Sequence, residues 1–177
     1  MAYVCCLGRS LNSERRLGVS GLSRKASCHL ILALFVGLLA APGLARATDL
    51  INQSSDGIAI RGYDTVAYFT DAKAIKGSDE FSYTWLGATW HFASAKHRDL
   101  FASDPVKYAP QYGGYCSGAM VDGSTANANP EAWRIVEGKL YLNASHAALL
   151  EWERNTAEEI GRADFQWGVI KAHLTTD

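Results

Sequence analysis

Residues 81–105 read FSYTWLGATWHFASAKHRDLFASDP, and this stretch decides the fold. Aromatic and hydroxyl side chains alternate over residues 81–85, which is typical of a half-buried strand. Leu86-Gly87 forms a tight connection to a second expected strand, Ala88–Ala93. We therefore expect the two strands to pair as an antiparallel hairpin.

The residues that follow this hairpin indicate helix. Ser94 is a suitable N-cap for a helix over residues 95–103, with Leu100 and Phe101 facing inward. Asp104-Pro105 combines a second cap with a proline at the first helical position, so it predicts a short further turn.

The later part of the chain predicts another hairpin and a final helix. Two apolar runs, 132–136 and 139–142, surround Glu137-Gly138, and Ser145 then begins a helix with an apolar stripe. Two hairpins with three to four helices predict an α+β fold in a single small domain. No internal repeat, heptad pattern or low-complexity segment is evident in the sequence.

The first 47 residues have the pattern of a secretory signal peptide. Basic residues precede an apolar run, LILALFVGLLAA at residues 30–41, which is too short to span a bilayer comfortably. Ala45-Arg46-Ala47 matches the small-x-small pattern, so we expect cleavage after Ala47. Arg15-Arg16 supports a twin-arginine signal only weakly, and Sec-type export is the expectation. The mature protein is then periplasmic or secreted, without a stable membrane span.

Removing the signal peptide makes the remaining chain acidic. Residues 48–177 carry 11 basic and 17 acidic side chains, a net charge of −6. This balance argues against nucleic acid and anionic lipid as partners and leaves a metal ion or a small molecule. We expect residues 48–57 to form a flexible leader and residues 58–175 to form the domain; no protein partner is indicated.

Cys116 is the most informative residue of the mature chain. It is the only one of four cysteines downstream of residue 47, and it lies in QYGGYCSG, residues 111–118. A lone thiol in an exported protein is either buried and inert, bound to a metal, paired with a partner or chemically reactive. Met120 would share a helix face with Cys116, and the two sulfurs together would suit copper(I).

Residues 87–108 resemble a YHS domain. The positions in step with that family are Phe92, Ser94, Phe101, Asp104, Pro105 and Tyr108. A fuller resemblance, to the longer exported YHS-domain proteins, covers residues 58–167. It rests on GYDTVAYF at residues 62–69, YGGYC at residues 112–116 and PEAW at residues 130–133. This resemblance implies a YHS-like core.

The resemblance also bears on chemistry. Short YHS domains are thought to bind metal through two cysteines, whose positions are Ala93 and His97 here, so that thiol pair is absent. The long exported group instead has its cysteine at the position of Cys116, and some members carry selenocysteine there. This implies a reactive or metal-ligating chalcogen rather than a packing residue.

Three interpretations of function follow. The first is an exported metal-binding protein, with Cys116, His97 and Met120 holding copper, zinc or another soft or borderline ion. The second is a single-cysteine redox protein, in which Cys116 is the catalytic residue and passes through a sulfenic acid or a mixed disulfide. The third is a non-catalytic binding or structural domain with a buried cysteine. The sequence contains no CxxC, GxSxG, P-loop or HExxH motif, so it assigns no enzymatic activity.

Overall fold

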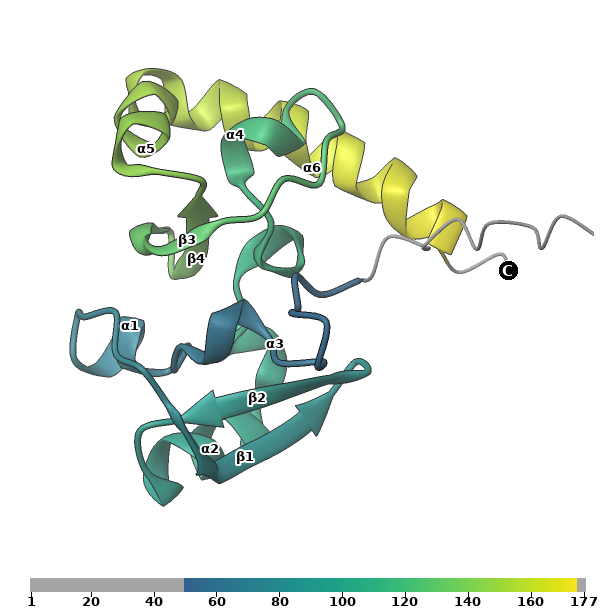
Figure 1. The fold of residues 1–177 in the computed structure, drawn as a ribbon. Coiled ribbons are helices and arrows are strands. Elements are labelled where there is room, and N and C mark those ends of the chain that lie inside the picture. The colour runs from purple at the N-terminus through teal and green to yellow at the C-terminus, as the bar shows by residue number, and fades with distance from the viewer. Residues whose placement is uncertain (1–49, 175–177) are drawn as a thin grey trace, which may run out of the picture. The chain divides into compact units, whose positions relative to one another are not determined.

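The computed structural model describes residues 50–174 (Figure 1). The expected signal peptide, its cleavage site after Ala47 and the export route lie outside these residues. Within residues 50–174, no helix is both long enough and apolar enough to cross a membrane.

The fold class is α+β with two antiparallel hairpins, as the sequence predicted. Strand β1 (Ser78–Trp85) pairs with β2 (Ala88–Phe92), and β3 (Asn129–Val136) pairs with β4 (Lys139–Asn143). Each hairpin reverses through a left-handed residue followed by a left-handed glycine, which is a conformation that tight two-residue turns require.

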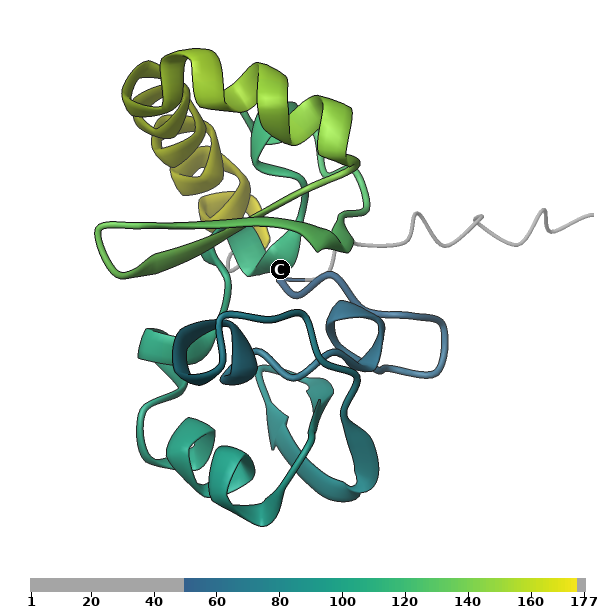
Figure 2. The ribbon, with the colours of Figure 1, turned by 90° about the vertical axis from the view of Figure 1, so that its left-hand side faces the viewer.

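The described residues contain more helices than the three to four expected, because three of them are single turns. The short ones are α1 (Ala67–Thr70), α3 (Pro105–Tyr108) and α4 (Ser117–Met120). The longer ones are α2 (Ala95–Ser103), α5 (His146–Trp152) and α6 (Thr156–Leu174). Three 3-10 turns complete the set: η1 (Ile60–Gly62), η2 (Gln111–Gly114) and η3 (Glu153–Asn155). Helix α2 lies against the first hairpin, whereas α5 lies against the second (Figures 1 and 2).

The predicted helix caps are present. The Ser94 hydroxyl accepts a hydrogen bond from the backbone N–H of His97 at 3.2 Å, and the Ser145 hydroxyl accepts one from Ala148 at 3.1 Å. Asp104 caps α3 in the same way, through the N–H of Lys107 at 3.1 Å. Each cap satisfies a backbone donor that the first helical turn would otherwise leave unpaired.

The two hairpins are copies of one another, displaced by 51 residues along the chain. Both ladders have five paired positions and a bulge at the same place. The ends of the ladders show the correspondence: Ser78↔Phe92 matches Asn129↔Asn143, and Trp85↔Ala88 matches Val136↔Lys139. The structure therefore contains an internal repeat, and the expectation that there was none is wrong.

The repeat extends to the segments before each hairpin, where the displacement is 52 residues. Turns η1 and η2 each contain at least one left-handed non-glycine residue, and both end at a left-handed glycine, Gly62 or Gly114. Next come Tyr63 and Tyr115, each of which forms an isolated bridge to a residue that leads into its hairpin. We call residues 60–101 the first repeat and residues 112–152 the second repeat.

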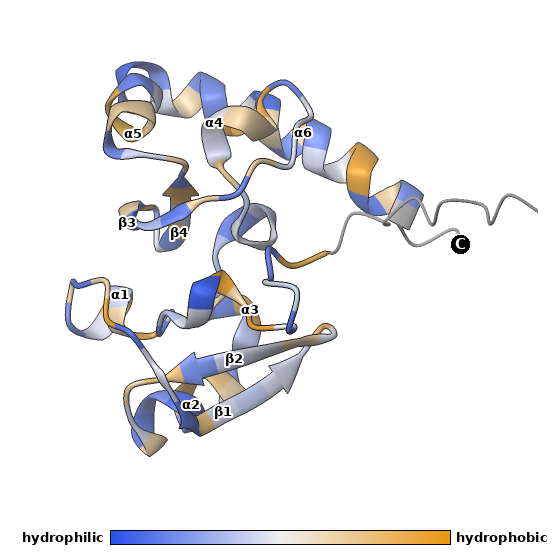
Figure 3. Ribbon diagram, in the orientation of Figure 1, coloured by the Kyte–Doolittle hydropathy of each residue, from blue (hydrophilic) through white to orange (hydrophobic). Residues whose placement is uncertain are grey.

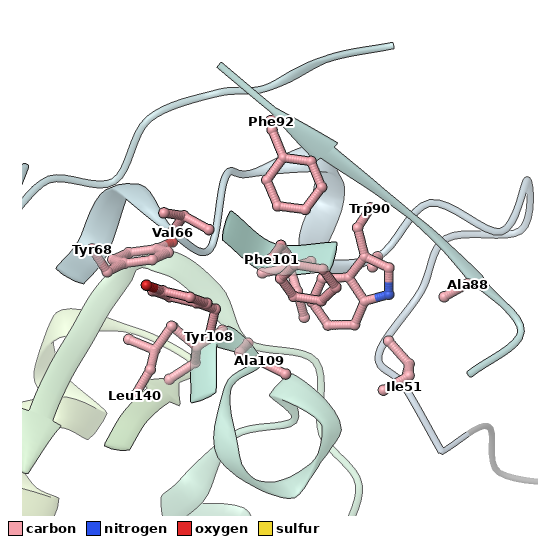
Figure 4. Packing of buried hydrophobic residues seen from close by; sticks show 14 residues of the cluster. Ile51, Val66, Tyr68, Ala88, Trp90, Phe92, Phe101, Tyr108, Ala109 and Leu140 are labelled. Carbon is pink, nitrogen blue, oxygen red and sulfur yellow. The ribbon is translucent and has the colours of Figure 1, made fainter. Parts of the chain in front are cut away.

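The core continues through both repeats. In the first repeat, Phe101 of α2 is fully buried beside Trp90 and Phe92, with ring centroids 4.9 and 5.1 Å away (Figure 4). In the second repeat, Trp152 takes the place of Phe101 and packs against Tyr141 at 5.3 Å. Leu140 and Leu142 of β4 join the core of the first repeat. Helix α6 alternates polar and apolar turns (Figure 3) and lies against α4.

The segment before residue 58 is part of the domain. Ile51 is 3% exposed and lies in the core, and the Asn52 N–H donates to Gly113 O at 2.8 Å. The Asn52 side-chain amide donates to Gly114 O at 2.9 Å. The flexible leader expected over residues 48–57 is therefore wrong for residues 50–57, because an apolar side chain and two hydrogen bonds hold this segment in place.

Candidate functional site: the Cys116 pocket

Cys116 lies between the second repeat's left-handed turn and its hairpin. It is the N-cap residue of α4, one position earlier than the first helical turn, and it is 3% exposed. Its Sγ accepts a hydrogen bond from the backbone N–H of Ala144 at 3.2 Å. Its S–H points to Asn143 Oδ1 at 3.8 Å. Sulfur is a weak partner in both roles, so these contacts orient the thiol more than they stabilise it.

Asp64 is the counterpart of Cys116 in the first repeat. Its backbone N–H donates to Ile75 O, as that of Cys116 donates to Ala126 O. Asp64 Oδ2 accepts the N–H of Ala93 at 2.8 Å, as Cys116 Sγ accepts the N–H of Ala144. The thiol therefore occupies a position that holds a buried carboxylate in the other repeat.

The two repeats differ in what lies beyond this position. In the first repeat, His97 Nδ1 donates to Asp64 Oδ2 at 2.7 Å and covers the carboxylate. The residue that corresponds to His97 in the second repeat is Ala148, which follows the capping Ser145 at the same spacing. A methyl group cannot fill the volume of an imidazole ring, so the thiol is left beside a space.

That space is a pocket of about 440 Å³, which we call the Cys116 pocket. Its lining residues are Cys116, Gly118, Ala119, Ala148, Glu151, Trp152, Arg154, Asn155 and Glu159. The lining thus combines small or apolar residues with charged ones. Arg154 pairs with Glu151 at 2.9 Å, while Glu159 has no ion partner among the described residues.

Three buried polar groups in this region lack a hydrogen-bond partner among residues 50–174: their residues follow Cys116 in the chain, lie 3.8 Å from Sγ through an amide oxygen, or line the pocket. They are the Ser117 hydroxyl, the Asn143 side-chain nitrogen and the Trp152 indole nitrogen. Ser117 and Asn143 are fully buried and Trp152 is 2% exposed. Buried polar groups are nearly always paired in folded proteins. The Thr65 hydroxyl, which is the counterpart of Ser117 in the first repeat, is unpaired as well, so the groups specific to this site are the Asn143 and Trp152 nitrogens, to which a ligand or a reaction product can supply the missing partner.

His97 and Met120, expected as co-ligands of Cys116, belong to other surroundings. His97 is held by Asp64, and its Nε2 lies 3.6 Å from Asp71 Oδ2 and 3.4 Å from Thr70 Oγ1. Met120 is fully buried among the aromatic residues of the second repeat. Among the described residues no hydrogen bond joins either side chain to the Cys116 thiol, and a shared ligand role for the three stays a prediction.

Metal binding at Cys116 stays a prediction. Among residues 50–174, no group of three or more His, Cys, Asp or Glu side chains is placed to hold one. A stable site for zinc or copper needs several N, S or O ligands at 2.0–2.3 Å. Cys116 supplies one, and the hydrogen-bond partners of its sulfur are a backbone N–H and an amide oxygen.

Several residues of this site could not be recognised as functional from their amino-acid type alone. The sequence pointed to Cys116, but Asn143, Ala148 and Glu159 attract no attention one by one. Their signal is the repeat: Ala148 becomes informative only once it is aligned with His97, 51 residues earlier. Asp64 accepts the N–H groups of Val66 and Ala67, and it also binds His97.

No protein-family model, curated protein or solved structure matches this chain. The resemblance to YHS domains drawn from the sequence stays a prediction. The geometry of the Cys116 pocket is therefore the basis for a function.

Proposed function

We propose that this protein is an exported single-thiol redox protein in which Cys116 is oxidised reversibly to a sulfenic acid. The observation that carries the proposal is that Cys116 lines a pocket and that two nearby buried nitrogens, those of Asn143 and Trp152, are unpaired. A cysteine with only a packing role needs no space next to its sulfur, and it needs no unpaired donors around it.

The chemistry requires a peroxide as the oxidant. The Cys116 thiolate attacks one oxygen of a hydroperoxide, so that an S–O bond forms and the O–O bond breaks. The other oxygen leaves with its substituent and takes a proton, as water or an alcohol. The Ala144 N–H points at the sulfur and favours negative charge on it. The Asn143 and Trp152 nitrogens are donors that can bind the new oxygen.

Direct detection of the sulfenic acid tests this proposal. Exported protein, reduced and then treated with one equivalent of hydrogen peroxide, should form a dimedone adduct at Cys116 that intact-mass and peptide mass spectrometry resolve. Cys116→Ser should give no adduct. The intact mass also checks cleavage after Ala47. A folded protein that forms no adduct, and that alkylates only after unfolding in urea, would falsify the proposal.

Metal binding is the second candidate, and one observation favours it in altered form. Two carboxylates, Glu151 and Glu159, line the same pocket as the Cys116 thiol, and thiolate with carboxylate is a ligand combination that zinc accepts. Equilibrium dialysis of the reduced protein against zinc and copper(I) separates the candidates. One bound ion per protein that Cys116→Ser no longer binds would favour metal binding. If His97→Ala also abolished binding of that ion, the result would support the ligand set first expected, Cys116, His97 and Met120.

A further inference from the structure

We propose that the Cys116 pocket takes a small, positively charged thiol as the reductant of Cys116. This inference rests on the proposed redox function and names the substrate class of its second half-reaction. Three features of the molecule lead to it. The chain has no second thiol to reduce its own sulfenic acid, the pocket admits only a small molecule, and the charge of the pocket determines the sign of the charge that this molecule carries.

The mature chain lacks a partner thiol. Cys116 is the only cysteine after residue 47, so no intramolecular disulfide can form in the mature chain. An external thiol R–SH must therefore attack the sulfenic sulfur. An S–S bond forms, the S–OH bond breaks and water leaves, which gives Cys116–S–S–R. A second R–SH then releases Cys116–SH and the disulfide R–S–S–R.

The surroundings of the sulfur limit the size of this thiol. Cys116 is 3% exposed and its pocket holds about 440 Å³. Gly118, Ala119 and Ala148 contribute only small groups to the lining, and a pocket of this volume has room for a short chain. A Cβ added at Gly118 would lie 4.0 Å from Sγ, so even one methyl group here borders the thiol directly.

The charge of the pocket favours a cation. The lining has two acidic side chains and one basic one, and Arg154 is already paired with Glu151 at 2.9 Å. The carboxylate of Glu159 is left without an ion partner among the described residues. The mature chain is also acidic, with a net charge of −6. A thiol with an amine a few bonds from its sulfur matches this arrangement, whereas one with carboxylates is repelled.

Three symmetric disulfides of similar size test the inference without needing the peroxide step. They are cystamine, which is cationic, 2-hydroxyethyl disulfide, which is neutral, and dithiodiglycolate, which is anionic. Each is mixed with the reduced exported protein, and formation of the mixed disulfide at Cys116 is followed by intact mass. Rates are divided by those of a free-cysteine peptide. We expect cystamine to react about three- to fivefold faster than the neutral probe, the size of an exposed ion-pair effect, and the anionic probe to be slowest.

Three variants locate the effect. Glu159→Gln should remove the preference for cystamine, while the adjacent Glu158→Gln, outside the pocket lining, should retain it. Ala148→Leu should slow all three probes by filling the space next to the sulfur. Equal relative rates for the three probes, or a preference that survives Glu159→Gln, would overturn the inference and leave the redox function intact. Failure of Cys116 to react with any probe and with peroxide would instead refute the proposed function itself.

Discussion

Asp64 shows how much one side chain can hold together. Its carboxylate is fully buried and accepts hydrogen bonds from the N–H groups of Val66, Ala67 and Ala93 and from the His97 ring. A carboxylate is acceptor-only, so these four donors satisfy it, and it ties α1, the end of β2 and the start of α2 together.

Replacing this carboxylate tests its role. Asp64→Ala leaves buried donors without a partner, and we expect it to lower the free energy of unfolding by about 3 kcal/mol or more. Asp71→Ala is the matched control, because Asp71 also faces His97 but is 43% exposed and 3.6 Å away. It should cost less than about 1 kcal/mol. Urea titrations followed by tryptophan fluorescence measure both, and equal costs would contradict this account.

At the scale of elements, the internal repeat makes Cys116 and Ala148 the counterparts of Asp64 and His97. Transplanting the pair is therefore a test of the repeat. Cys116→Asp alone buries an unpaired carboxylate, and we expect a loss of about 2–4 kcal/mol. Adding Ala148→His supplies the partner that the first repeat has, and should restore at least half of that loss. A double-mutant cycle in urea measures the coupling, and additive effects of the two changes would show that the repeats are not equivalent here.

Glycines give a second test at this scale. Gly113 has φ +63°, and a Cβ there would lie 1.9 Å from the Leu50 carbonyl oxygen. Gly113→Ala should therefore destabilise the protein by several kcal/mol or prevent folding.

Gly168 lies inside α6, and a Cβ added there would meet no atom within 4 Å. Gly168→Ala should raise the free energy of unfolding by about 0.5–1 kcal/mol, measured in the same urea titrations.

The strands and caps could be predicted because they depend on neighbours in the sequence. The first hairpin could be predicted from the alternation of side-chain types around Trp85 and Trp90. The starts of two helices could be predicted from the positions of Ser94 and Ser145. The internal repeat could not be predicted from the sequence, because few amino acids are identical between its two copies. In addition, the displacement between the copies changes from 52 residues before the hairpins to 51 within them. The site was missed in part for the same reason, since His97 looks like a partner of Cys116 until the structure assigns it to Asp64.

At the scale of the whole molecule, buried tyrosines connect segments that are far apart in the sequence. The Tyr68 hydroxyl donates to Pro130 O at 2.8 Å and joins α1 to β3. The Tyr112 hydroxyl donates to Asp164 Oδ1 at 3.0 Å and joins η2 to α6. Burial raises the pKa of both phenols above the usual value, and it raises the pKa of Tyr141 to about 12.

These shifts predict the response of the fold to alkaline pH. A phenol with a raised pKa stays neutral in the folded state, whereas an unfolded tyrosine ionises near about pH 10. The unfolded state therefore binds fewer protons above that pH, and the contribution of these phenols to the free energy of unfolding should be constant up to about pH 9 and fall steeply between about pH 10 and pH 12. Tyrosinate absorbance and far-ultraviolet circular dichroism, recorded on the same samples, should change together for these three residues. Tyr141→Phe should reduce the slope of stability against pH in that window, because the variant has one fewer buried phenol to ionise. If the tyrosinate signal of all tyrosines developed with the circular dichroism unchanged, the buried hydroxyls would not be holding the repeats and α6 together.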